Sequence, residues 1–171
     1  MIRVALFALI SLPLLRAGDP IQFRTITVPE PAAKVSSDLV RHPINEKARH
    51  LLLKALETMN TGDHESAIEQ LLAVLAKYPE SAAYVHSLVG VEYIKTGRYP
   101  DAINSFEQAV ALLPHDAVNR YNLGLSFVCN GDFERGAQEV RRALQMYPGN
   151  QAMRALLDAL IKEKLISPAE P

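Results

Sequence analysis

The residues able to carry chemistry are few and scattered along this 171-residue chain. A zinc-binding helix needs two histidines four residues apart, because that spacing places both imidazoles on one face. None of the five histidines has a partner at that spacing; they are His42, His50, His64, His86 and His115. The dipeptide His64-Glu65 begins like a zinc-protease motif, but Ile68 stands where the second histidine would be. The histidines therefore predict no metal site.

The sequence also lacks the motifs that activate a nucleophile or bind a phosphate. There is no glycine-rich phosphate loop and no nucleophile elbow. The single cysteine, Cys129, cannot form an intramolecular disulfide, and its pattern is typical of a small apolar residue near a helix end. Because no base, nucleophile and metal set can be assembled, the sequence predicts neither an enzyme nor a cofactor site.

The composition favours one helical domain with a continuous core. Apolar residues make up 49% of the chain, enough to fill the interior of a domain of this length. The net charge is -1, and acidic and basic residues alternate along the predicted helix faces. A nucleic-acid-binding protein would need a basic stripe or patch. The sequence therefore predicts no nucleic-acid partner.

A repeat of about 34 residues organises the chain, and each unit is predicted to be two helices joined by a glycine turn. Gly90 and Tyr93 lie one turn apart on a first helix, Gly97 breaks it, and Tyr99-Pro100 begins the second. Four landmarks recur at intervals of 35 and then 34 residues. They are Ala55, Gly90 and Gly124; Gly62, Gly97 and Gly131; Val74, Ala109 and Ala143; and Pro79, Pro114 and Pro148.

This pattern resembles the tetratricopeptide repeat, which has a bulky residue, Leu-Gly, an aromatic, Ala, an aromatic and Pro over 34 residues. The middle unit matches at Val89-Gly90, Tyr93, Ala102, Phe106 and Pro114. The third matches at Leu123-Gly124, Phe127 and Pro148, but has Gly136 and Val140 where Ala and an aromatic are usual. The first matches least, at Lys54-Ala55, Thr58, Ala67, Leu71 and Pro79.

The resemblance implies an all-α fold, a right-handed α-solenoid of three helix-turn-helix pairs plus a C-terminal capping helix. One pair cannot bury its apolar face alone, so stacking of the units supplies the core. The expected domain is 46–166, with units at about 48–81, 83–116 and 117–150 and a capping helix at 151–164. Asn45 and Asn150 are the predicted N-caps of the first and last helices.

The first 45 residues differ from the repeats. Arg3 followed by an apolar run over 4–15 predicts a signal peptide at 1–17, because about 20 apolar residues would be needed to span a bilayer. An uncleaved anchor and a misplaced start codon are the alternatives. Residues 18–45 are rich in proline and predict an extended linker. The chain is thus similar to small exported members of the family, periplasmic or secreted if bacterial.

The family's best-known ligand is an acidic chaperone C-terminus, held by Lys, Asn and Arg side chains on the first helices of the pairs. The equivalent positions in this chain are Leu52, Leu56, Leu88, Val118 and Asn122. Only Asn122 is polar, so the resemblance does not extend to this carboxylate clamp.

In the family, the first helices line a concave groove, and in this chain that face is mostly apolar. It predicts a partner-binding groove formed by Leu52, Leu56, Tyr84, Val91, Ile94, Tyr121, Leu125 and Val128. An apolar groove suits an apolar peptide or an amphipathic helix. Two alternatives remain: neighbouring helices bury part of this stripe, or residues 21–44 or a second copy of the chain occupy it.

Taken together, these patterns predict a non-catalytic adaptor or scaffold that binds a protein or peptide outside the cytoplasm. No membrane span is expected in the mature chain. The alternative function is a self-associating structural subunit of an envelope or secretion assembly, which would make a homodimer possible.

Overall fold

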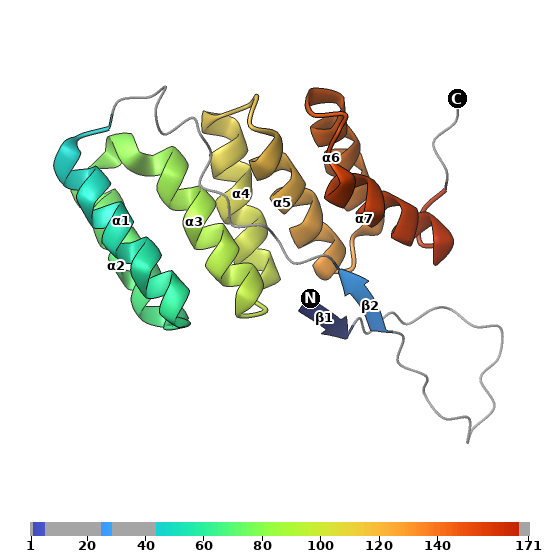
Figure 1. Cartoon of the computed structure of the whole chain (residues 1–171), viewed down its shortest axis with the longest axis horizontal. Helices are drawn as coiled ribbons and strands as arrows, with labels where there is room; N and C mark the ends of the chain where they lie inside the picture. The colour runs from blue at the N-terminus through green and yellow to red at the C-terminus, as the bar shows by residue number, and fades with distance from the viewer. Residues whose placement is uncertain (1, 6–24, 29–43, 168–171) are drawn as a thin grey trace, which may run out of the picture.

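The computed structural model describes residues 2–5, 25–28 and 44–167, and Figure 1 shows its helices side by side in chain order. Seven α-helices fill most of 44–167. They are α1 (Glu46–Thr61), α2 (His64–Lys77), α3 (Ala82–Lys95), α4 (Tyr99–Leu112), α5 (Ala117–Cys129), α6 (Phe133–Met146) and α7 (Gln151–Lys162). A short 3-10 helix, η2 (Pro79–Ser81), joins α2 to α3.

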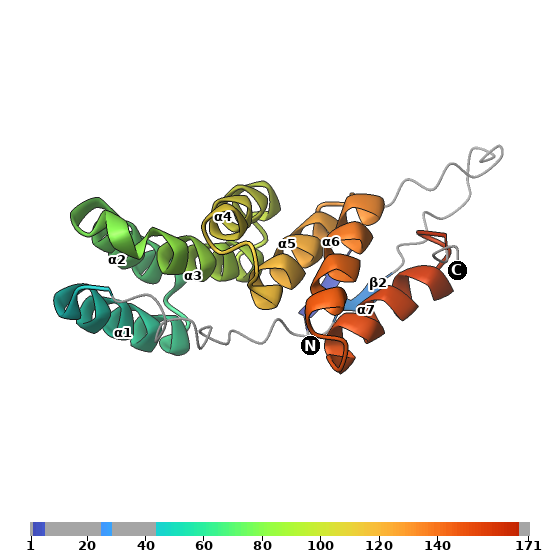
Figure 2. The ribbon, with the colours of Figure 1, turned by 90° about the horizontal axis from the view of Figure 1, so that it is seen from above.

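The helices form three stacked pairs and a final single helix. Within the pairs, α1 packs on α2, α3 on α4 and α5 on α6. Between them, α2 contacts α3, α4 contacts α5 and α6 contacts α7. Figure 2 shows the row bending, with α1 and α7 at its two ends displaced to the same side. The predicted all-α solenoid of three helix-turn-helix pairs plus a C-terminal helix is confirmed.

The helix starts follow from capping side chains. Asn45 and Asn150 accept hydrogen bonds from the backbone amides of Lys47 (2.8 Å) and Met153 (3.1 Å), as predicted. Each bond satisfies one of the amides that the first turn of a helix leaves unpaired. Three further helices, α2, α5 and α6, begin after capping aspartates, which are Asp63, Asp116 and Asp132.

A glycine with positive φ closes each pair. The φ angles of Gly62, Gly97 and Gly131 are 82°, 75° and 88°, in the left-handed region that side chains with a Cβ rarely adopt. These are the equivalent positions of the three units. The recurring glycine therefore turns the chain between the two helices of every pair.

Small residues set the distance between the helices of a pair. A Cβ added at Gly90 would lie 2.7 Å from the Phe106 ring, and one at Gly124 would lie 2.8 Å from the carbonyl oxygen of Gly136. The third unit has Gly136 where the family pattern has alanine, and Gly136 faces Gly124 at the point where the two backbones meet. A Cβ at either glycine would lie 2.8 Å from the carbonyl oxygen of the other, so this approach of α5 to α6 needs both glycines.

Two features lie outside the predicted pattern. The last helix ends at Lys162, two residues before the expected boundary, and Lys164 adopts a φ of 57°. Two short strands, β1 (Ile2–Ala5) and β2 (Thr25–Val28), form an antiparallel pair. They fall within the predicted signal peptide and linker. The rest of these two predicted segments, apart from Ile44 and Asn45, lies outside the described residues.

The close approach of α5 to α6 generates a stability prediction. Gly124→Ala should lower the free energy of unfolding by about 1–3 kcal/mol, because its Cβ would meet backbone atoms that cannot rotate away. Gly149→Ala is the matched control, since its Cβ would meet nothing within 4 Å and its φ is not positive. Urea midpoints measure both. Equal midpoints for the two variants would contradict the packing argument.

Candidate functional site

An apolar cleft opens between α1 and α3 at the start of α5, and it is named here the α1–α3 cleft. Helix α1 contributes Arg49, Leu52, Leu53 and Leu56. The other lining residues are Ala83, Tyr84, Ser87, Leu88, Leu113, Asp116 and Asn119. The volume of the cleft is about 40 Å³. One water molecule needs roughly 10–15 Å³, so the cleft has room for about three groups of the size of a water molecule.

Three polar side chains, Ser87, Asp116 and Asn119, lie toward the α5 side of the cleft. Asp116 Oδ1 accepts hydrogen bonds from the amides of Val118 (2.8 Å) and Asn119 (3.0 Å), which fixes the carboxylate at the start of α5. Ser87 Oγ donates to Asn119 Oδ1 at 2.6 Å and joins α3 to α5. Arg49 is exposed on the α1 side. The cleft therefore combines aliphatic walls with one carboxylate and one exposed cation.

The structure brings three of the eight predicted groove residues together. Leu52 and Tyr84 are buried, Leu56 is half-buried, and all three line the α1–α3 cleft. The other five belong to the hydrophobic core and do not line it; they are Val91, Ile94, Tyr121, Leu125 and Val128. Each is between 0% and 6% exposed. For these five, the structure favours the alternative in which packing buries the stripe.

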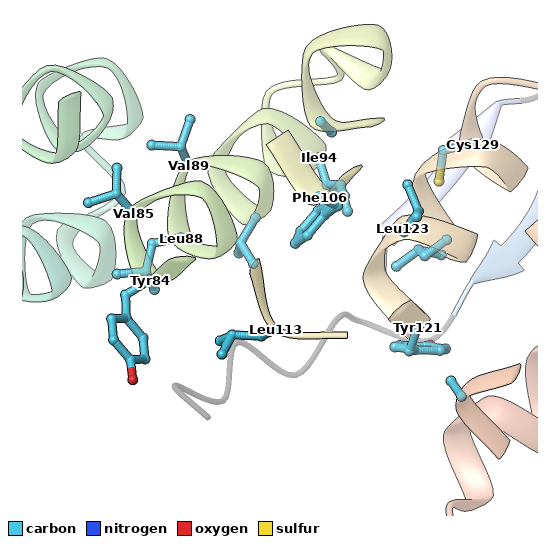
Figure 3. Close-up of a cluster of buried hydrophobic side chains, with 14 of the residues drawn as sticks. Tyr84, Val85, Leu88, Val89, Ile94, Phe106, Leu113, Tyr121, Leu123 and Cys129 are labelled. Carbon is cyan, nitrogen blue, oxygen red and sulfur yellow. The ribbon is translucent and has the colours of Figure 1, made fainter. Parts of the chain in front are cut away.

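The physical reason lies in the central helices. Helix α3 buries side chains around most of its circumference, and Figure 3 shows Tyr84, Val85 and Val89 projecting from it in different directions. Helix α5 is buried over most of its length in the same way. A helix that is apolar all round is a buried helix. The open stripe that the family resemblance implies is therefore buried at these five positions near the centre of the array.

Eight of the eleven lining residues are absent from the predicted groove, and Leu53 and Asp116 are two of them. Leu53 is 54% exposed and lies at the rim, one position away from the predicted stripe. The three consecutive leucines at 51–53 could have indicated an exposed apolar side chain, because successive residues of a helix point in different directions and cannot all face the core. Asp116 carried only the signal of an N-cap, since nothing local indicates that its second oxygen is buried.

Two buried glutamates tie neighbouring helices together elsewhere. Glu92, fully buried on α3, lies 2.6 Å from His64 Nδ1 at the start of α2 and 2.8 Å from Lys95 Nζ. Glu139 on α6 receives Arg120 at 3.0 Å and Arg142 at 2.5 Å. Burial of a charged carboxylate costs free energy, and pairing of this kind offsets the cost. These glutamates are therefore structural links, and His64 is committed to one of them.

Burial also explains the protonation of two groups on α5. Loss of hydration raises the pKa of Cys129 to about 12, so its thiol stays protonated near neutral pH. Burial, and secondarily the nearby Cys129, raises the pKa of Tyr121 to about 12. Both groups are neutral members of the core. Within 44–167 and the two strands, no three metal-binding side chains of the His, Cys, Asp and Glu types gather, and no helix is both long and apolar enough to cross a bilayer.

Comparison with known proteins places this arrangement among helical repeats. A family model described as a tetratricopeptide repeat matches residues 52–117, 89–151 and 121–165. MamA from Desulfovibrio magneticus RS-1 superposes with a TM-score of 0.63 at 23% identity, over 68% of this chain and 66% of that chain. This chain thus spans about two thirds of that relative.

Two further structures share the fold. The second TPR domain of human RPAP3, solved in complex with the HSP70 peptide SGPTIEEVD, matches with a TM-score of 0.63 at 20% identity, over 68% of this chain and 96% of its own. The Yersinia enterocolitica type III secretion translocator chaperone SycD, in an alternative dimer, matches with a TM-score of 0.65 at 14% identity, over 71% of this chain and 97% of its own. At these identities the likeness shows the fold alone.

The contrast between core and cleft can be tested with two acidic substitutions. Val91→Glu should lower the free energy of unfolding by about 3 kcal/mol or more, because it buries an unpaired charge at a site that is 2% exposed. Leu53→Glu should change it by only about 0.5 kcal/mol, since this side chain faces water. Thermal denaturation followed by circular dichroism measures both. A Val91→Glu protein as stable as wild type would restore the wider groove.

Proposed function

The chain belongs to the tetratricopeptide repeat family, and from this premise we propose that it is a non-catalytic adaptor or scaffold whose α1–α3 cleft binds an apolar segment of a protein partner. The observation that carries the proposal is the cleft itself. It is walled by Leu52, Leu53 and Leu56 and is open at the rim, where Leu53 is half exposed. An aliphatic wall gains free energy when a partner's apolar side chain removes it from water.

The cleft disfavours an acidic chaperone tail. A related domain, the second TPR domain of human RPAP3, was solved with a peptide that ends in EEVD. Here Leu52, Leu56 and Leu88 line the cleft where a carboxylate clamp would need polar groups, and Asp116 adds a negative charge. Repulsion of like charges would oppose a ligand rich in glutamate and aspartate. The ligand chemistry therefore differs from that of the clamp.

A non-catalytic role is supported by where the reactive side chains lie. His64 is paired with the buried Glu92, and Cys129 is buried on α5 with its pKa raised by loss of hydration. Neither side chain lines the α1–α3 cleft. A nucleophile or base must reach its substrate, so these two groups are unsuited to chemistry on a cleft-bound ligand.

Export is the second part of the proposal. Residues 1–17 combine an early arginine with an apolar run of signal-peptide length, and cleavage after Ala17 would leave Gly18 as the first residue. Sequencing of the mature N-terminus, on protein isolated from its native cells, should therefore begin at Gly18. Recovery of Met1 on the mature protein would contradict removal of this segment.

Partner binding through the cleft can be tested by affinity capture from native extract followed by mass spectrometry. Leu53→Glu should lose the partners that wild type captures, because it places a charge on the apolar rim without disturbing the core. Leu72→Glu is the matched control: Leu72 is a 44% exposed leucine of the same repeat that does not line the cleft.

If both variants lose the captured proteins, or if both keep them, the cleft is not the binding surface. Light scattering at several concentrations addresses the alternative of self-association. A stable dimer whose formation is prevented by Leu53→Glu, and not by Leu72→Glu, would replace the foreign partner with a second copy of the chain.

A further inference from the structure

Asp116 has a carboxylate oxygen that capping leaves unused. Its Oδ1 binds the two amides at the start of α5, whereas its Oδ2 is buried and has no hydrogen-bond partner among the described residues. The residue is 5% exposed and lines the α1–α3 cleft. A buried carboxylate oxygen without a donor is unfavourable, because it has lost its hydrogen bonds to water and no protein hydrogen bond replaces them.

The capping role alone does not account for this arrangement. Asp132 caps α6 by the same device, accepting a hydrogen bond from the amide of Arg135, but its side chain is 38% exposed. The second oxygen of Asp132 lies 3.6 Å from the Arg135 guanidinium. The buried glutamates Glu92 and Glu139 are likewise paired with cations. Asp116 differs from these carboxylates in being both buried and short of one donor.

The walls around Asp116 select the donor. Leu52 and Leu56 supply aliphatic surface, and the ring of Tyr84 lies on the opposite, α3 side of the cleft. Lysine and arginine pack their aliphatic stems on apolar surface while their charged heads seek an oxygen. A hydrogen bond between a cation and a carboxylate is about twice as strong as a neutral one. The room of about 40 Å³ admits the end of one such side chain and excludes a whole helix.

We propose that the α1–α3 cleft reads one basic side chain of the partner, whose charged head binds Asp116 Oδ2 while its stem lies between Leu52, Leu56 and Tyr84. This inference rests on the proposed function and specifies the residue type that the site recognises. Arg49 is the other charged residue of the cleft and is exposed at the rim, where water and salt screen its repulsion of a basic ligand.

The test is a titration of the full ¹⁵N-labelled chain with n-butylguanidinium, which reproduces the end of an arginine side chain. Saturable shifts are expected at the amides of Val118 and Asn119, because both donate to the carboxylate that binds the probe. The uncharged analogue n-butylurea has nearly the same shape and should bind at least tenfold more weakly. The proposal is overturned if the wild-type protein shows no saturable shift. This holds also if the shift is absent because a second copy or the chain's own N-terminal residues fill the cleft.

The decisive variant is Asp116→Asn, because asparagine caps a helix as well as aspartate does but carries no charge. Its affinity for n-butylguanidinium should fall at least tenfold. Asp132→Asn, the matched change at the start of α6, should leave the affinity unchanged. Asp116→Ser also retains a cap and replaces Asp116→Asn if that variant does not fold. Equal affinity of wild type and the folded Asp116 variant overturns the proposal.

Failure of this inference can be told apart from failure of the proposed function. If Leu53→Glu abolishes partner capture while Asp116→Asn does not and the probe fails to saturate, the basic-residue site is wrong and the apolar cleft stands. If the probe binds through Asp116 while Leu53→Glu captures the same proteins as wild type, the basic-residue site stands and partner binding through the cleft is wrong.

Discussion

The close approach of paired helices at residues without bulky side chains is the constraint on which the structure depends. Gly90 admits the ring of Phe106, and Gly124 and Gly136 allow two backbones to meet. These contacts set the distance and angle between the two helices of a pair. Since every pair then presents similar apolar faces, the pairs stack and the core becomes continuous along the row.

Stacking buries the middle of the array more completely than its ends. Helices α3 and α5 belong to pairs that have packed helices on both sides, and they bury side chains around most of their surface. Among the described helices α1 has a neighbouring pair on one side only, and it retains the half-exposed Leu53 beside the half-buried Leu56. A partly exposed apolar surface therefore remains at the α1 end of the described helices.

The buried carboxylates divide into two kinds with different consequences. Glu92 lies within reach of Lys95 and the His64 ring, and Glu139 within reach of Arg120 and Arg142, so both carboxylates hold neighbouring elements together. Asp116 has its first oxygen bound to backbone amides and its second unpaired in the α1–α3 cleft. A carboxylate of the first kind is part of the scaffold, whereas one of the second kind is available to a ligand.

The sequence by itself determined the helices, their pairing and the family, because these depend on local spacing. Each of these features shapes the backbone only within a few residues of its own position. They are the landmarks that recur about every 34 residues, the glycine turns at Gly62, Gly97 and Gly131, and the caps at Asn45 and Asn150. Which face of each helix meets water was decided only by the tertiary structure. Val91 and Leu56 follow the same helical pattern, but Val91 lies in the middle of the stack and Leu56 near its edge. The unpaired oxygen of Asp116 is likewise invisible in the sequence, because burial depends on neighbours that are distant along the chain.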